Sequence, residues 1–163
     1  AQYYPVNEPR TFLTSGSLGT MGFGLPAAIG ASLQNPQKRI ICISGDGSIL
    51  MNIQELATLA ENNLAVTVII FVNHTLGMVY QQQKFLFDKN YSASTFSAQP
   101  DFLQIAKGFG IEGTNANTDS EWFKKAFDQN RKNRPFIVTV KVDPEENVLP
   151  FVPGGKANID SIR

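Results

Sequence analysis

Two continuous apolar runs dominate the hydrophobic pattern of the chain. The first covers residues 39–44 and leads into a Gly-Asp-Gly turn, and the second covers 65–72 and ends at Asn73. Both runs are rich in β-branched residues and lack the alternation of a half-buried strand. We therefore expect strands that are buried on both faces, as in a parallel sheet. Further strands are predicted at 136–142 and, more briefly, near 11–13 and 111–114.

Apolar residues at helical spacing fill the stretches between these runs. Within 52–62, for example, Ile53, Leu56 and Ala60 fall on one helical face. Strands and helices thus alternate, which is typical of βαβ crossovers and of an α/β fold whose parallel sheet is flanked by helices. The predicted helices are 21–33, 52–62, 101–109 and 120–131, the last with Asp119 or Ser120 as its N-cap.

Other segments show no clear period. Residues 81–100 are polar and aromatic, which predicts a helix end followed by a long loop. Proline and glycine recur from residue 143 onward, so we expect 143–163 to form a C-terminal tail without a further strand. Residues 1–4 resemble the end of a helix whose beginning is missing. The length of 163 residues fits one domain, spanning 1–163.

Composition excludes several classes of function. Fourteen basic and fourteen acidic residues balance, which argues against binding to nucleic acid or to an anionic membrane. Cys42 is the single cysteine and His74 the single histidine, which excludes a disulfide framework, a cysteine-built zinc site and a multi-histidine metal centre. No apolar run has the length of a membrane span, and no signal peptide is recognisable. These features predict a soluble, cytoplasmic protein.

Hard oxygen ligands follow two of the predicted strands. Asp46 lies between two glycines after the first apolar run, and Asn73 ends the second. Ligands of open parallel sheets bind beyond the carboxyl ends of the strands, and residues that lead into a helix can offer N–H groups to a phosphate. Carboxylate and amide oxygens suit Mg²⁺ rather than zinc or copper. The residues alone therefore indicate a site for Mg²⁺ and a diphosphate.

Gly-Asp-Gly by itself is common in tight turns, where Asp46 would be only a turn or N-cap carboxylate. The combination with Asn73 after a spacer of one helix and one strand resembles the thiamine-diphosphate signature. Other segments resemble the acetolactate (acetohydroxyacid) synthase large subunit: 15–31, 45–48, 51–56, 76–79, 91–92, 146–150 and 153–155. The chain is identified as similar to the C-terminal, cofactor-diphosphate domain of that family. The resemblance implies a three-layer sandwich with a parallel sheet flanked by helices, N-terminally truncated.

The resemblance also implies which residues hold the cofactor and its metal. Asp46, the side-chain oxygen of Asn73 and the backbone carbonyl of Thr75 would bind Mg²⁺, with two diphosphate oxygens and a water completing the shell. The diphosphate itself would meet Gly45, Gly47 and Ser48.

Four further residues are implied at the organic part of the cofactor. Gly19 would offer its backbone to the aminopyrimidine, and Met21 would lie under the bent cofactor. Gly77 and Met78 would line the cofactor and the substrate entrance. By residue type alone the two methionines would more often be core fillers, and only the motifs around them favour the cofactor. His74 is interpreted as a surface or loop residue without a catalytic role.

The chain departs from the family in two respects. Gln82 stands where the family has a tryptophan that shapes the second-substrate pocket, so selectivity for that substrate is left open. The glutamate that activates the cofactor has no counterpart here, so no catalytic residue is expected in 1–163. The resemblance places it on a pyrimidine-binding domain of the same or a neighbouring subunit. It also implies a homodimer or tetramer with a small regulatory subunit, and apolar surface on the isolated chain.

The expected activity is that of acetolactate synthase, a transferase of branched-chain amino-acid biosynthesis. It decarboxylates pyruvate and condenses the two-carbon unit with a second 2-oxo acid. Another thiamine-diphosphate-dependent decarboxylase or carboligase is the alternative, and a non-catalytic binding domain is a third hypothesis. We expect the chain alone to be inactive. A dinucleotide-binding fold fits poorly, because Gly19, Gly22 and Gly24 do not form the required motif after a strong strand.

Overall fold

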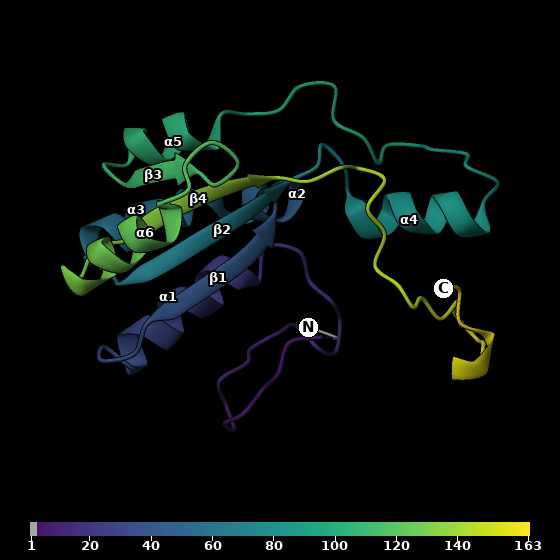
Figure 1. The fold of residues 1–163 in the computed structure, drawn as a ribbon, viewed down its shortest axis with the longest axis horizontal. Coiled ribbons are helices and arrows are strands. Elements are labelled where there is room, and N and C mark those ends of the chain that lie inside the picture. The colour runs from purple at the N-terminus through teal and green to yellow at the C-terminus, as the bar shows by residue number, and fades with distance from the viewer. Residues whose placement is uncertain (1–2) are drawn as a thin grey trace.

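Four parallel strands form the centre of the computed structural model, which describes residues 3–163. Their order in the sheet is β1-β2-β4-β3 (Figure 1). Because all four run in one direction, their carboxyl ends meet at one edge of the sheet. The strands are β1 (Ile40–Gly45), β2 (Val66–Val72), β3 (Glu112–Asn115) and β4 (Phe136–Lys141).

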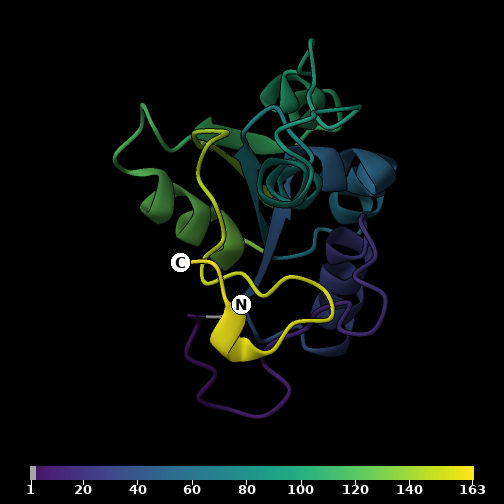
Figure 2. The ribbon, with the colours of Figure 1, turned by 90° about the vertical axis from the view of Figure 1, so that its right-hand side faces the viewer.

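Helices lie on both faces of this sheet, and Figure 2 shows them on either side of the strands. On one face, α1 (Gly24–Gln34), α3 (Leu56–Glu61) and α5 (Phe102–Gly108) pack on the main core, which includes Val68. On the other face, α6 (Trp122–Arg131) packs on a smaller core around Val138. The predicted α/β fold with a parallel sheet flanked by helices is confirmed. The remaining helices are α2 (Asp46–Ile49), η1 (Leu50–Glu55), α4 (Gly77–Leu86) and η2 (Asn158–Asp160).

Several predicted bounds were wrong. Residues 11–13 are irregular and form no strand. The helix predicted at 52–62 is a 3₁₀ segment with a non-helical Asn52, followed by α3. The last helix begins at Trp122, with Glu121 as N-cap. Asp119 caps the preceding turn instead, since its Oδ1 accepts the Glu121 N–H at 3.0 Å.

The first helix also begins later than predicted. It starts at Gly24 rather than at residue 21, because Gly22 has a left-handed φ of 83° that ends any helical path before it. Of the predicted helix end at 1–4, residues 1 and 2 lie outside the described residues, and Tyr3 is in a turn.

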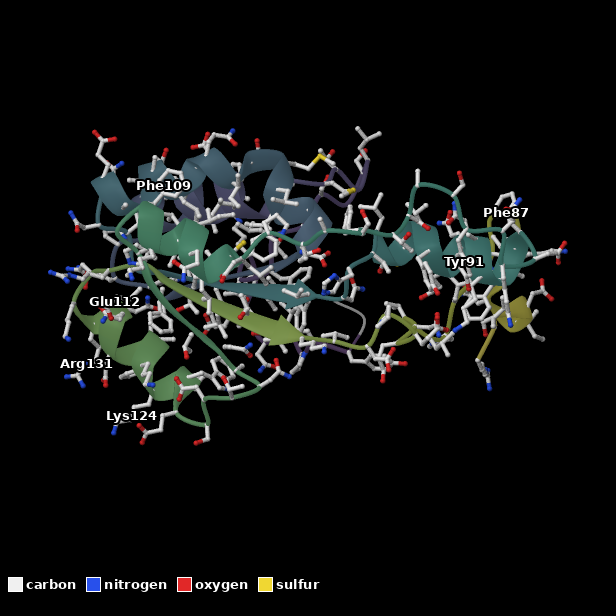
Figure 3. The ribbon with its side chains drawn as sticks, turned by 90° about the horizontal axis from the view of Figure 1, so that it is seen from above. Phe87, Tyr91, Phe109, Glu112, Lys124 and Arg131 are labelled. Carbon is white, nitrogen blue, oxygen red and sulfur yellow. The ribbon has the colours of Figure 1, made fainter. Side chains whose placement is uncertain are left out.

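Helix α4 and the C-terminal tail lie apart from the sheet, beyond the carboxyl ends of the strands (Figure 1). Figure 3 shows Phe87 and Tyr91 at that distant end and Glu112 and Arg131 at the opposite one. The expected loop after α4 and the irregular tail are both present. Besides η2, the tail has one isolated bridge, between Phe151 and Ile162.

One face of β1 is left open. Ile41 and Ile43 point away from the main core and are 57% and 62% exposed, and Phe71 on β2 is partly exposed beside them. A helix is about 10 Å wide, whereas neighbouring strands are about 4.8 Å apart. One helix, α6, therefore cannot cover all four strands, and the expected apolar surface is found over β1.

Other sequence expectations concern single groups. Cys42 is buried in β1, and burial raises the pKa of its thiol to about 11. It therefore acts as a small apolar residue, as predicted. No helix within 3–163 combines the length and the apolar character needed to cross a membrane.

Candidate metal and diphosphate site

Asp46 lies directly after β1 and is 1% exposed. Its Oδ2 accepts the backbone N–H groups of Asn73 at 3.1 Å and His74 at 2.8 Å, and its Oδ1 accepts the N–H of Gly47 at 2.8 Å. Three donors offset much of the cost of burying a carboxylate. The carboxylate thus joins the end of β1 to the loop after β2, and Asp46 and Asn73, two of the three predicted metal ligands, lie together.

Asn73 begins a tight turn over this carboxylate. Its Oδ1 accepts the N–H of Thr75 at 3.1 Å, and His74 has a left-handed φ of 60°. An amide oxygen has two lone pairs, so Asn73 keeps one for a further partner. Thr75 is buried, and its Oγ1 has no hydrogen-bond partner among the described residues. His74 contributes its backbone to the site.

The donor set fits a hard divalent cation. It combines the Asp46 carboxylate and the Asn73 side-chain amide at the carboxyl ends of β1 and β2, and the buried Thr75 follows two residues after Asn73. Within 3–163 there is no cluster of three or more His, Cys, Asp or Glu side chains that would hold a metal. Oxygen ligands supplemented by substrate phosphates are the usual environment of Mg²⁺. The residues therefore fit the magnesium and diphosphate that the sequence indicates.

The two glycines that flank Asp46 have different surroundings. A Cβ at Gly47 would lie 2.6 Å from Leu76 Cδ2 and 3.1 Å from Phe96 Cζ, so a side chain there would have to displace Leu76. It would also lie 3.5 Å from the methyl carbon of Met21, which places Met21 beside this turn. No described atom lies within 4 Å of a Cβ built on Gly45. Gly45 thus borders open space, as a residue in contact with a ligand would.

A network missed by the sequence analysis holds the loop of residues 15–22 against this turn. Ser48 Oγ accepts the N–H of Gly22 at 3.0 Å, and Asn52 Nδ2 donates to the Gly22 carbonyl at 2.9 Å. A Cβ at Gly22 would lie 2.7 Å from Asn52 Nδ2 and 2.8 Å from Met51 Cβ. The non-helical φ of Asn52, −139°, directs its side chain to this bond. Such a long-range contact has no local sequence signal.

The other predicted cofactor residues make fewer contacts with the turn of Asp46 and Asn73. Gly77 starts α4 beside Asn73, where its Cβ would lie 3.3 Å from Asn73 Nδ2. Met78 is 51% exposed on the first turn of α4. Gly19 has a left-handed φ of 67° and is exposed. The Gly47 N–H, one of the groups expected at the diphosphate, donates to Asp46 in this structure.

Residues 1–140 match the family described as thiamine pyrophosphate enzyme, C-terminal TPP binding domain. The chain belongs to this family. Thiamine pyrophosphate is thiamine diphosphate, so the cofactor implied by the signature is also that of the family. The buried Asp46 and the adjacent Asn73 therefore lie within a thiamine-diphosphate-binding domain.

Curated relatives of this domain are acetolactate synthase large subunits. The chain is 49% identical over 99% of its length to the isozyme 1 large subunit of Escherichia coli and covers 29% of that protein. It is 42% identical to the isozyme 2 large subunit, with 30% covered. A probable acetolactate synthase large subunit from Methanococcus aeolicus is 39% identical, with 28% covered. The chain therefore spans about three tenths of the length of these relatives.

Solved structures agree on the fold. A thiamine diphosphate-dependent 4-hydroxybenzoylformate decarboxylase from Rhodococcus jostii superposes with a TM-score of 0.67 at 32% identity, over 77% of this chain and 24% of the other. Benzoylformate decarboxylase from Polynucleobacter necessarius superposes with a TM-score of 0.79, over 89% of this chain and 28% of the other. The latter is 22% identical, so that likeness concerns the fold alone.

Proposed function

We propose that this chain is the diphosphate- and Mg²⁺-binding domain of an acetolactate synthase large subunit. The whole enzyme would decarboxylate pyruvate and condense the remaining two-carbon unit with a second 2-oxo acid, in branched-chain amino-acid biosynthesis. The observation that carries the proposal is the Asp46–Asn73 turn within a domain of the thiamine-diphosphate family. The 49% identity to one such large subunit supports the reaction.

In this proposal, Asp46, Asn73 Oδ1 and the Thr75 carbonyl bind Mg²⁺, and the open side of Gly45 accepts the diphosphate. When bound, thiamine diphosphate supplies the electron sink for loss of carbon dioxide from a 2-oxo acid. The residues of this chain bind and orient that group. The buried carboxylate is held by backbone donors, which fixes the metal position before the cofactor arrives.

Gly47 and Ser48 complete the diphosphate side of the proposed site. Gly19, Met21, Gly77 and Met78 belong to its organic side. The closeness of Met21 to Gly47 and of Gly77 to Asn73 supports these two assignments, whereas Gly19 and Met78 depend on the family resemblance. The same resemblance supports a pyrimidine-binding partner domain that carries the activating glutamate, a homodimer or tetramer, a small regulatory subunit and a cytoplasmic enzyme.

A chimera tests this proposal. The chain replaces the corresponding part of the Escherichia coli isozyme 1 large subunit, and acetolactate formation from pyruvate is measured. We expect activity that depends on Mg²⁺ and is abolished by Asp46→Ala. The matched control is Asp128→Ala, an exposed aspartate on α6, which leaves activity unchanged. Activity that survives Asp46→Ala with normal Mg²⁺ dependence contradicts the proposed site. Acetaldehyde without acetolactate favours the decarboxylase alternative.

A further inference from the structure

Helix α4 is held by a buried polar residue rather than by apolar packing on the sheet. It carries Gly77 and Met78, two residues of the proposed site, but lies away from the sheet (Figures 1 and 3). All of α4 is described, and only one of its residues is buried, the polar Gln81. Met78, Val79 and Leu86 are exposed. Apolar packing on the sheet therefore does not fix the orientation of this helix.

The side chain of Gln81 forms a paired contact with the C-terminal tail. Its Nε2 donates to the Val148 carbonyl at 3.1 Å, and its Oε1 accepts the Val148 N–H at 2.7 Å. The side chain thus reproduces the pair of bonds that two residues exchange across an antiparallel ladder. Gln81 is 3% exposed. A buried amide with both functions satisfied specifies a single arrangement of the segments it joins.

This contact closes a circuit of chain segments and hydrogen bonds that includes the turn of Asp46 and Asn73. The tail leaves β4, and the Val142 N–H donates to the Val72 carbonyl at 3.0 Å. Val72 directly precedes Asn73. The segments 72–81 and 142–148 are therefore joined at one end by a bond at the sheet and at the other by Gln81. The circuit connects the position of α4 to the strands that carry the site.

Other contacts between α4 and the tail are exposed or only half-buried. Tyr80 Oη and Lys84 Nζ each donate to Glu145, at 2.6 Å, and the rings of Phe85 and Phe151 lie 6.2 Å apart. Ion pairs at exposed positions contribute little to stability. Gln83, two residues from Gln81, instead bonds Ser92 in the loop after α4. Gln81 is thus the buried connection between helix and tail.

We propose that Gln81 is a positioning residue of the cofactor site. By holding α4 to the tail, it fixes the first helical turn, with Gly77 and Met78, beside the Asp46–Asn73 turn. Gln81 acts through α4 and does not touch the cofactor. The inference rests on the proposed function, because the role of Gly77 and Met78 is part of it.

The first test measures hydrogen exchange in the chimeric enzyme. The Val148 N–H is protected only while Gln81 Oε1 accepts it, so Gln81→Ala is expected to speed its exchange about tenfold or more, as two lost hydrogen bonds imply. Gln81→Glu keeps the acceptor and retains most of the protection. The control is Gln104→Ala, an exposed glutamine on α5, which leaves it unchanged. Unchanged protection of Val148 in Gln81→Ala overturns the inference.

The second test separates positioning from folding. For Gln81→Ala, the concentration of thiamine diphosphate that gives half-maximal activity is expected to rise about tenfold, whereas kcat at saturating cofactor changes less. Gln81→Glu, which keeps one of the two bonds, gives an intermediate value. Loss of Val148 protection without a change in cofactor saturation overturns the positioning role. If the unmodified chimera forms no acetolactate, the proposed function fails, and the exchange experiment still decides whether Gln81 holds the tail.

Discussion

Asp46 Oδ2 accepts the backbone N–H of Asn73 at 3.1 Å, across the ends of two neighbouring parallel strands. The bond joins residues that are far apart in the chain, and both have oxygen atoms suited to Mg²⁺. The carboxylate therefore has a structural role even without a metal, since it organises the turn that brings Asn73 and Thr75 to the site.

This structural role can be measured as stability. Asp46→Ala removes the acceptor of three backbone N–H groups in a buried position. We expect the free energy of unfolding in urea to fall by about 3 kcal/mol, because buried donors are left without partners. Asp128→Ala, at an exposed position, is expected to change it by less than about 0.5 kcal/mol. Equal stability of the two variants would contradict the buried network.

The Gly22 position gives a second prediction. Gly22→Ala places a Cβ 2.7 Å from Asn52 Nδ2 in a backbone with φ of 83°, so we expect a loss of at least about 1 kcal/mol and a lower Tm. Gly154→Ala is the control, since no described atom lies within 4 Å of its Cβ. An unchanged Tm for Gly22→Ala would show that the loop of residues 15–22 is not held as described.

The contact between α4 and the tail is expected to weaken in acid. The Lys84 ammonium and then the Tyr80 hydroxyl, both bonded to Glu145, lower the pKa of its carboxyl, with a smaller contribution from Lys89. A lowered folded-state pKa means that the stabilisation is complete above the unfolded value, about 4.3, and is lost as pH falls through the folded value. Hydrogen exchange of residues 143–148, corrected for intrinsic rates, should therefore increase below about pH 4. Glu145→Gln should remove this dependence, and a dependence that persists in it would exclude Glu145 as the source.

The contact with Glu145 also changes the pKa of the Tyr80 phenol. Its hydrogen bond to Glu145, followed by the effect of the neighbouring Tyr91 hydroxyl, raises the pKa of the phenol above its usual range. Ultraviolet titration of Glu145→Gln should show one tyrosine that ionises at lower pH than in the unmodified chain. Identical titration curves for the two proteins would show that the bond does not persist in solution.

The open face of β1 predicts self-association of the isolated chain. Ile41 and Ile43 are exposed on a sheet that has no charged residue along β1 to oppose pairing. Sedimentation velocity should show a mass that increases with concentration, and Ile41→Lys with Ile43→Lys should restore a monomer. The control is Ile159→Lys, a more exposed residue in the tail, which should leave association unchanged. Monomeric behaviour of the unmodified chain would contradict this prediction.

The sequence by itself determined the strands β1, β2 and β4, because long β-branched runs bury both faces wherever they lie in a parallel sheet. It also predicted that Asp46 and Asn73 lie together, because parallel strands bring their carboxyl ends to one edge. It failed at 11–13, whose residues favour a strand but have no neighbouring strand to pair with among the described residues.

Only the tertiary structure decided the rest. The late start of α1 depends on Gly22, whose left-handed backbone is held by Ser48 and Asn52 from a distant segment. Gln81 lies in a polar run, which is typical of an exposed position. It is buried instead, because its side-chain amide makes the two hydrogen bonds with the Val148 backbone that another strand would otherwise make. Periodicity reports burial averaged over an element, whereas these hydrogen bonds join single residues across the fold, so no local pattern records them.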